Sequence, residues 1–312
     1  CTANTTDTIP EPLLNRMEVI SFPGYTAVEK YHIARKHLIP KAMEVMGIRK
    51  NMLKITDGAL RQIIDEYTME SGVRDLKKCI ETICRSAAVE LVKNAPSGDE
   101  GTDAVSAENS ISVTKSSLTD YLGRKQIHSE RKLSTKTAGV VTGLAWTRAG
   151  GEILFIETKL TEGKGKLTIT GQLGDVMKES VQIALSLVKS LYPKECKVFE
   201  NHDLHIHVPA GAVPKDGPSA GITLTTALAS LVTGKAVDTD IAMTGEVSLR
   251  GGVMPIGGLP EKLMAAQRAG IKKVFIPEDN VEDLEDVAEE VKEKLEIIPV
   301  KKVTDVLKKA LG

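Results

Sequence analysis

The sequence predicts an α+β protein in which an N-terminal helical bundle is followed by an α/β domain. Its 312 residues suffice for about two domains. Apolar residues recur at helical spacing from residue 25 to 95, whereas short β-branched runs alternate with helical patterns after residue 139. A charged stretch at 123–135 separates the two patterns.

Three helices are expected in the N-terminal part. Thr26 caps the first, which is kinked or restarted at Pro40. Thr56 begins the second and Ser71 the third, and both carry apolar residues on one face. Composition predicts a solvated loop at 95–110, a short strand at 111–113 and a short helix at 117–122.

The charged stretch is interpreted as a linker, which we favour over a basic nucleic-acid patch because its charges suit a solvated segment. The domain boundary is therefore placed there. The expected units are a short N-terminal segment at 1–24, a helical domain at 25–122, the linker at 123–135 and the α/β domain at 136–312.

The α/β domain opens with a predicted hairpin. Residues 139–147 and 151–159 read as strands around a glycine-containing turn. An amphipathic helix follows from Gly174 to Leu191 and is stopped by Pro193. The other expected elements are strands at 166–170, 204–208, 241–244 and 273–277, and helices at 222–232, 281–291 and 303–311.

Composition argues against several classes of function. A net charge of −1 and 3% aromatic residues do not support DNA or RNA binding, which needs excess positive charge and stacking rings. The four cysteines show no metal or disulfide spacing, so a reducing, cytoplasmic location is expected. No apolar run reaches the ~18 residues of a membrane span and no signal peptide is recognised, so no membrane association is expected.

Ser219 is the best nucleophile candidate in the chain. Pro218 suits the first position of a helix, which places Ser219 in the first turn beside free backbone N–H groups that could hold an oxyanion. Gly217 and Gly221 complete a G-x-S-x-G pattern. The α/β-hydrolase interpretation fails, because that fold needs a histidine after the serine and none of the six histidines lies there.

His205 and His207 are expected on one face of the strand that precedes the serine, since side chains alternate along a strand. They could serve as a base, as half a metal site or as ordinary packing. Two histidines without a third ligand are a weak zinc signal, so packing is favoured and no metal is expected.

Lys262 is the alternative base. Pro260 marks a helix start and Gly270 a helix end, so the lysine occupies the first turn, where the helix dipole disfavours a cation. Its neighbours one and two turns later are alanines, which allow tight packing, and both effects lower a lysine pKa. The competing interpretation is a lysine whose amine reaches solvent from a helix start.

Three motifs resemble the proteolytic domain of the Lon family of ATP-dependent proteases. They are Pro214-Lys-Asp-Gly-Pro-Ser-Ala-Gly221, Met243-Thr-Gly-Glu-Val-Ser-Leu-Arg-Gly251 and Pro255-Ile-Gly-Gly-Leu-Pro-Glu-Lys262. The resemblance implies a Ser219 nucleophile and a Lys262 general base that is hydrogen-bonded by Thr244, against the plain interpretation of a strand-end threonine. Further residues implied by these motifs are Asp216, Gly217, Pro218 and Ala220 as supports of the dyad, and Trp146 and Thr147 in the substrate groove. Trp146 as a core residue remains the alternative.

The N-terminal part is similar to the end of the AAA+ ATPase core and its α-subdomain in the same family. Asn4 then matches a sensor residue, Arg16 an arginine finger and Arg74 a second sensor, although an exposed first-turn arginine is the plain interpretation of Arg74. No G-x-x-x-x-G-K-[ST] phosphate loop occurs in the sequence. We therefore expect this chain to be a piece of a longer parent protein, and that parent to use ATP with Mg.

The resemblance implies a serine endopeptidase that degrades unfolded or damaged proteins in protein quality control, with a homohexameric parent. No cofactor is expected for the peptidase chemistry itself. This chain is expected to cleave unstructured polypeptides without ATP and not to unfold stable ones. Two rival interpretations are a phosphate-binding enzyme, in which residues 214–221 cradle the phosphate, and a domain of this family that serves only assembly.

Overall fold

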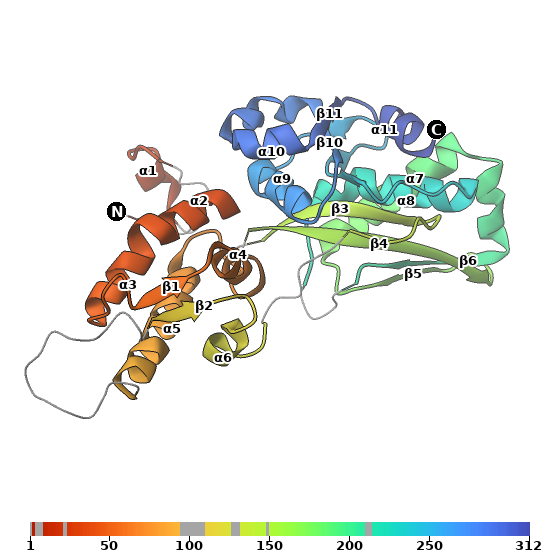
Figure 1. Ribbon diagram of the computed structural model, residues 1–312. Helices are drawn as coiled ribbons and strands as arrows, with labels where there is room; N and C mark the ends of the chain where they lie inside the picture. Colours follow the sequence, from red (N-terminus) through yellow and green to blue (C-terminus); the bar gives the residue numbers. More distant parts are fainter. Residues whose placement is uncertain are drawn as a thin grey trace, which may run out of the picture.

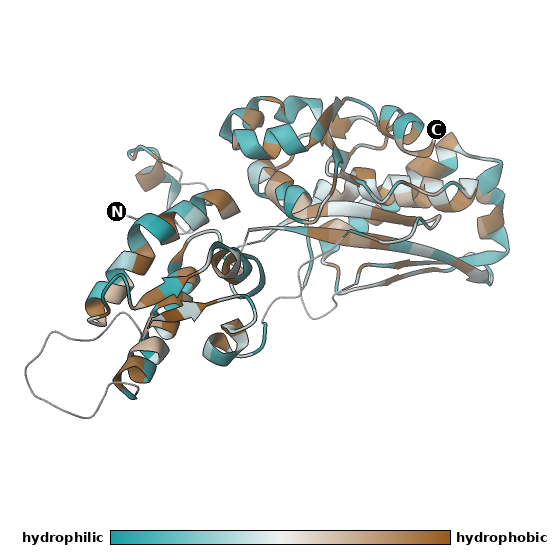
Figure 2. Cartoon of the chain, viewed as in Figure 1, coloured by the Kyte–Doolittle hydropathy of each residue, from teal (hydrophilic) through white to brown (hydrophobic). Residues whose placement is uncertain are grey.

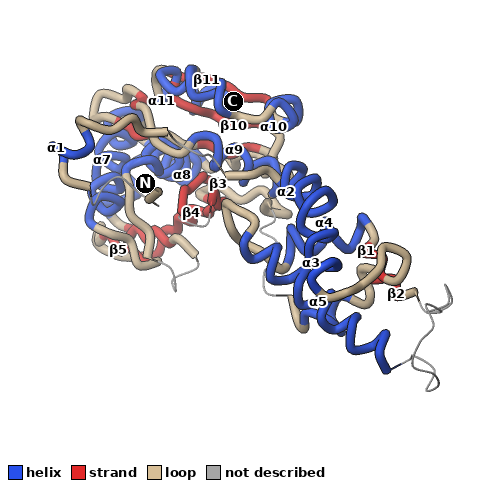
Figure 3. The backbone as a smooth tube through the Cα atoms, turned by 90° about the vertical axis from the view of Figure 1, so that its left-hand side faces the viewer, coloured by secondary structure: helices blue, strands red, loops and turns tan. Residues whose placement is uncertain are grey.

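Two groups of elements lie side by side in the computed structural model (Figure 1), one around a single hydrophobic core and the other with a core on each face of its sheet. The structure describes residues 2–3, 9–20, 24–93, 110–125, 132–147, 150–209 and 214–312. Helices dominate the first group, and a mixed sheet between helices forms the second, so the predicted α+β class is confirmed. Figure 3 shows the same two groups from the side.

The first group is a small helical bundle with one short pair of strands. Thr26 caps α2 with a reciprocal bond to Glu29: the Glu29 N–H donates to Thr26 Oγ1 at 3.2 Å, and the Thr26 N–H donates to Glu29 Oε2 at 2.8 Å. Thr56 caps α4 through the Ala59 N–H at 3.3 Å. The elements are α1 (Glu11–Leu14), α2 (Ala27–Ile33), α3 (Ile39–Val45), β1 (Leu53–Ile55), α4 (Asp57–Glu66), α5 (Arg74–Lys93), β2 (Ile111–Val113) and α6 (Leu118–Leu122).

Pro40 does not interrupt the first long helix. The chain passes from α2 through a π-helical turn, η1 (Ala34–Leu38), directly into α3, where Pro40 is the second residue. A proline in a regular helix lacks a donor and clashes with the carbonyl four residues earlier, and the wider turn accommodates both effects. In place of the expected kink or restart at Pro40, the structure has a π-helical turn just before it.

A mixed sheet of seven strands, counted within the described residues, organises the second group. Its order is β11-β10-β7-β3-β4-β6-β5. The hairpin β3–β4 is antiparallel, with Val140 opposite Glu157 and Thr147 opposite Gly150, and β7 pairs in parallel with the other side of β3. The strands are β3 (Val140–Thr147), β4 (Gly150–Glu162), β5 (Leu167–Thr170), β6 (His202–His207), β7 (Ile241–Met243), β10 (Lys273–Pro277) and β11 (Glu296–Val300).

Helices cover both faces of this sheet. In β10 the buried Phe275 joins the core under α7, α8 and α11, whereas Val274 and Ile276 on the other face join the core under α9 and α10. Brown, hydrophobic residues accordingly run along the strands in Figure 2. The helices are α7 (Asp175–Leu191), α8 (Gly221–Thr233), α9 (Leu259–Arg268), α10 (Glu289–Lys294) and α11 (Val303–Leu311). No helix of the described segments combines the length and apolar character needed to cross a bilayer.

The single helix expected at 281–291 is wrong. That stretch forms one 3-10 turn, η6 (Glu282–Asp286), and the start of the short α10; another 3-10 turn, η5 (Glu278–Asn280), precedes it. Val287 is extended and only 4% exposed, so burying its side chain draws the backbone out of a helix. The sequence analysis also missed β11, whose Pro299 is tolerated because β11 is the edge strand.

The two cores predict two separable unfolding transitions. Leu60→Ala removes a fully buried side chain of the helical bundle, which costs about 2–5 kcal/mol. Trp146, the single tryptophan of the chain, lies in β3 and reports only on the sheet domain. Because both domains contain helices, the circular-dichroism signal during denaturant unfolding should show two transitions. We expect Leu60→Ala to move the one that belongs to the bundle while leaving the fluorescence transition of Trp146 in place. Phe275→Ala should do the reverse, and a joint shift in either variant would contradict separable domains.

Candidate active site

The Ser219 turn lies between β6 and α8. Gly217 has φ of 136°, a conformation that glycine adopts readily, and Pro218 then begins the 3-10 turn η4 (Pro218–Ala220). The half-buried Ser219 follows and α8 continues directly from Gly221. The predicted placement of Ser219 in a first helical turn is therefore found in the structure, with the backbone N–H groups that such a turn leaves available.

Contacts from neighbouring elements fix this turn. The Asp216 carboxylate accepts the Met177 N–H of α7 at 2.9 Å and the Gly217 N–H at 3.0 Å. The Ser219 carbonyl oxygen accepts the Gly245 N–H at 2.8 Å and the Thr244 hydroxyl at 3.4 Å. The backbone on both sides of the nucleophile candidate is thus held by α7 and by the segment after β7.

Lys262 comes from the first turn of α9. The helix begins after Gly258, whose φ is 68°, and ends before Gly270 at φ 79°. Only 2% of Lys262 is exposed, and the alanines on its side of the helix are also buried. Burial lowers the pKa of the Lys262 amine to about 8, although the charge of Glu261 opposes this change.

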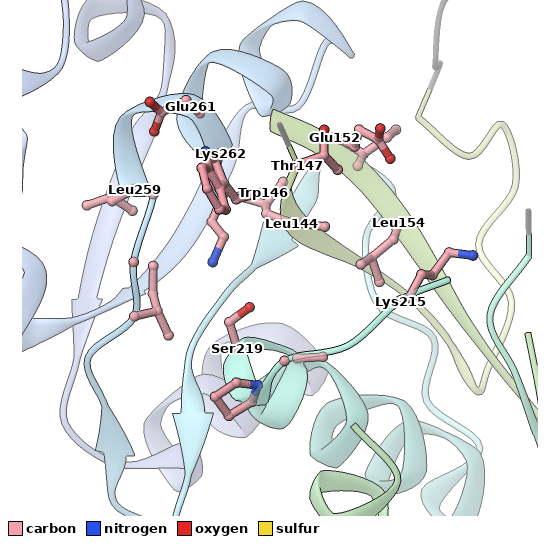
Figure 4. Close-up of a pocket in the computed structure, with 18 of the residues that line it drawn as sticks. Leu144, Trp146, Thr147, Glu152, Leu154, Lys215, Ser219, Leu259, Glu261 and Lys262 are labelled. Atoms are coloured by element: carbon pink, nitrogen blue, oxygen red, sulfur yellow. The ribbon is translucent and has the colours of Figure 1, made fainter. Parts of the chain in front are cut away.

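The amine and the hydroxyl face each other across one cleft. Figure 4 shows Lys262 pointing from α9 toward Ser219, whose side chain points back from η4. The cleft has a volume of about 1430 Å³ and is also lined by Trp146, Thr147 and residues 214–220 in the described part. Trp146 is 56% exposed and lies along this cleft instead of inside a core.

β3 is an interior strand of the sheet, between β7 and β4. It pairs with β4 along its whole length, but its pairing with β7 covers only Thr142 and Gly143. Beyond Gly143, Leu144 and Trp146 have no strand partner on the β7 side within the described residues, and both line the cleft. An extended peptide can therefore approach the end of β3.

Comparison with known proteins identifies this arrangement. The family model described as the Lon protease (S16) C-terminal proteolytic domain matches residues 112–312, and that of the Lon protease AAA+ ATPase lid domain matches residues 44–99. The chain belongs to the Lon protease family. The match to the proteolytic domain starts upstream of the boundary expected at 123–135 and includes β2 and α6.

Curated Lon proteases resemble the whole chain. The chain is 56% identical over 311 residues to Lon protease of Clostridium beijerinckii, covering 100% of this chain and 38% of the relative. It is 48% identical over 341 residues to Lon protease of Lachnoclostridium phytofermentans and 49% identical over 312 residues to that of Methanosarcina barkeri, with 99% of this chain covered in both cases. It covers 42% and 38% of these two relatives, so it spans about two fifths of the length of the Lon proteases that it matches.

Thr244 supports the serine side of the Lon site in this structure. It is fully buried, and its hydroxyl donates to the Ser219 carbonyl oxygen. Its N–H donates to the Phe275 carbonyl oxygen at 3.1 Å, which ties the end of β7 to β10. A hydrogen bond from Thr244 to Lys262 stays a prediction.

The two strand histidines lie outside the Lon cleft. His205 and His207 are half-buried on β6, and the Thr170 hydroxyl lies 2.9 Å from His205 Nε2 and 2.7 Å from His207 Nδ1. Within the described part of the chain, no group of three or more potential His, Cys, Asp or Glu ligands could hold a metal ion. The contacts of these histidines are those of polar residues packed across a strand pair.

The residues matched to nucleotide contacts lie far from the cleft in sequence and are not among its lining residues. Arg16 is exposed after α1, and Arg74 is the exposed first residue of α5. Asn4 lies outside the described residues.

Several apolar cleft residues escaped the sequence analysis. Leu144 could have been found, because it lies two positions before Trp146 and therefore faces the same side of the strand. Two more lie in the Pro255–Lys262 motif itself, and two come from distant segments to which nothing local in the sequence points. They are Leu154, Met177, Ile256 and Leu259.

Burial of Lys262 predicts a stability difference that depends on pH. Because its pKa falls from 10.5 to about 8 on folding, the unfolded chain binds more protons between these values, and stability rises with pH there. Below about pH 8 the full cost is present, roughly 3 kcal/mol. Lys262→Met should therefore be more stable than wild type at pH 7, with the advantage shrinking toward pH 10.5, as measured by denaturant unfolding. Lys309→Met, at an exposed position of α11, is the matched control, and an advantage that is constant with pH would contradict the prediction.

Proposed function

We propose that this chain is a Ser–Lys endopeptidase of the Lon type. The observation that carries the proposal is the buried Lys262 amine facing Ser219 in the cleft. Uncharged Lys262 removes the proton from the Ser219 hydroxyl as the oxygen attacks the scissile carbonyl carbon. The backbone N–H groups of Ser219 and Ala220, which follow Pro218 in the η4 turn, stabilise the oxyanion that forms.

The proton on Lys262 then passes to the leaving amine, and an ester of Ser219 with the acyl half of the substrate remains. Lys262 next takes a proton from water, whose oxygen attacks the ester carbon. When the ester breaks, the proton returns to the Ser219 oxygen and the amine is uncharged again. The geometry supports this cycle because one buried base faces the nucleophile and the space beside it.

The substrates we propose are unstructured polypeptides. The end of β3 offers backbone groups to any extended chain, and Trp146 and Leu144 offer apolar surface beside the dyad. Backbone pairing carries little sequence information, which suits the degradation of unfolded or damaged proteins in cytoplasmic quality control. The Lon proteases matched here are longer proteins, and a hexameric assembly of the whole protein is part of the same proposal.

In this proposal the whole protein uses ATP with Mg, and the cleavage of the peptide bond does not require it. The lid-like bundle presents Arg74 at the start of α5, but the chain contains no phosphate loop to hold the nucleotide. The residues present therefore do not form a complete nucleotide site, and no step of peptide cleavage involves ATP.

Removal of either dyad residue tests the peptidase. Ser219→Ala and Lys262→Met should each lower kcat/KM on an unstructured peptide by about 10³-fold or more, because nucleophile and base act as a unit. A peptidyl boronate should label Ser219 in wild type, as read by mass spectrometry, while Ser219→Ala stays unlabelled. Lys309→Met is the control with ordinary activity, and unchanged turnover in either dyad variant would refute the mechanism.

The pH dependence of cleavage tests the lysine separately. Since the uncharged amine is the base and its pKa is about 8, kcat/KM should rise through pH 8 and level off above it. A peptide substrate without ionisable side chains keeps the profile specific to the enzyme. A rate that falls as pH rises through this range would rule out Lys262 as the general base.

Omission of ATP tests whether peptide cleavage is independent of ATP-driven unfolding. The chain should digest a permanently unfolded polypeptide at equal rates with and without Mg-ATP, whereas a stable folded domain should survive in both conditions. ATP-stimulated loss of the folded domain, followed by gel electrophoresis, would contradict the proposal.

A further inference from the structure

The turn end of the β3–β4 hairpin rests on α9, the helix that carries Lys262. A Cβ at Gly151 would overlap the Glu261 carbonyl oxygen, so the start of β4 contacts the first turn of the helix directly. A Cβ at Gly258 would lie 2.8 Å from Trp146 Cγ, so the end of β3 also lies against the helix start. The strand that lines the cleft and the helix that supplies the amine therefore meet at two points.

Arg268 stabilises this contact through a hydrogen bond to the hairpin. It is the last residue of α9 and lies two helical turns after Glu261, on the same side of the helix. Its Nη2 donates to the Gly151 carbonyl oxygen at 2.8 Å, across 117 positions of sequence. The side chain is exposed as a whole, but the hydrogen bond is partly buried. A hydrogen bond from a charged group is stronger than one between neutral groups.

Residues of the helical bundle lie near the same arginine. A second cavity, of about 480 Å³, is lined by Arg268 and Gln267 of α9, by Gly151 and by residues of α2 and α4 of the bundle. Asp65 of α4 lines it too; burial raises the pKa of this carboxyl, and the Arg268 charge partly offsets that rise. The other charged residues lining the cavity are Lys30, Arg61, Glu66, Glu70, Glu261, Glu290 and Lys294.

We propose that Arg268 is a positioning residue of the peptidase, which holds the β3–β4 hairpin against α9 and so keeps the substrate strand and the Lys262 amine at a fixed separation. The inference rests on the proposed function, because it concerns the same dyad. Arg268 does not line the cleft in the described structure and acts only through Gly151.

Loss of this hydrogen bond has two consequences in the cleft. The hairpin is freer to leave α9, so an extended substrate binds less well and KM rises. Water also gains access to the Lys262 amine. Burial lowers the pKa of this amine and the Glu261 charge raises it, so added water moves the pKa toward that of an ordinary lysine. Both effects differ from those of a general loss of stability.

The single tryptophan allows a test without catalysis. We suggest comparing Arg268→Gln with Lys309→Gln, both in a Ser219→Ala background, by acrylamide quenching of Trp146 fluorescence. Arg268→Gln should raise the quenching constant because Trp146 loses its support on α9, and Lys309→Gln should not. Arg268→Lys keeps the charge without the forked donors and should fall between wild type and Arg268→Gln.

The same substitutions in the active chain test the effect on peptide cleavage. Arg268→Gln should raise KM about fivefold, the effect of losing one ordinary hydrogen bond, with a smaller change in kcat. The midpoint of the rise of kcat/KM with pH should also move upward. Lys309→Gln should leave both unchanged.

The outcomes separate the two proposals. Wild-type quenching, KM and pH midpoint in Arg268→Gln would overturn the positioning role even if Ser219→Ala still abolishes cleavage. If the wild-type chain cleaves no peptide, the proposed function fails, and the quenching data alone decide whether Arg268 holds the hairpin. If Arg268→Gln does not fold, Arg268→Lys carries the test: a quenching constant above that of wild type supports the role, and the wild-type value overturns it.

Discussion

A lysine amine kept out of water is the constraint on which the rest of the site depends. Lys262 is 2% exposed, and lowering its pKa from 10.5 to about 8 costs the folded chain roughly 3 kcal/mol at neutral pH. That is a large fraction of the 5–15 kcal/mol by which domains are typically stable. The cost is sustained by two cores on opposite faces of one sheet, which supply far more buried apolar surface than a single helix could.

The sheet also explains why the two dyad residues can face each other. Ser219 precedes α8, which packs on one face, and Lys262 begins α9, which packs on the other. Each residue lies at the start of its helix, where side chains reach past the strands into the cleft. Hydrogen bonds from the Thr244 hydroxyl and the Gly245 N–H to the Ser219 carbonyl fix one start, and the tight packing of Gly151 fixes the other.

Local chemistry explains which parts of this arrangement the sequence predicts. Pro218, Pro260 and Gly270 mark helix ends by their own backbone preferences, so the first-turn positions of Ser219 and Lys262 follow from the sequence alone. The region 281–291 fails for the opposite reason: a helical pattern is overridden by the burial of Val287 and by Asn280, whose side chain bonds both backbone groups of Ile256. Leu154, Met177 and Ile256 join the cleft through tertiary packing, and no spacing in the sequence connects them.

A lysine base requires that water be excluded from its amine, which a histidine base does not require. An unperturbed histidine is already largely uncharged at neutral pH, whereas a lysine becomes a base only where its charged form is penalised. The penalty on Lys262 comes from burial, so every wall of the cleft contributes to the reactivity of the amine as well as to substrate binding. In this fold one wall is a hairpin that rests on the lysine's own helix, and the helical bundle lies against the far end of that helix. Under the proposed mechanism, peptide-bond chemistry and the position of the neighbouring domain are therefore linked through α9, because a movement that lets water reach its first turn restores the charge on Lys262 and removes the proposed base.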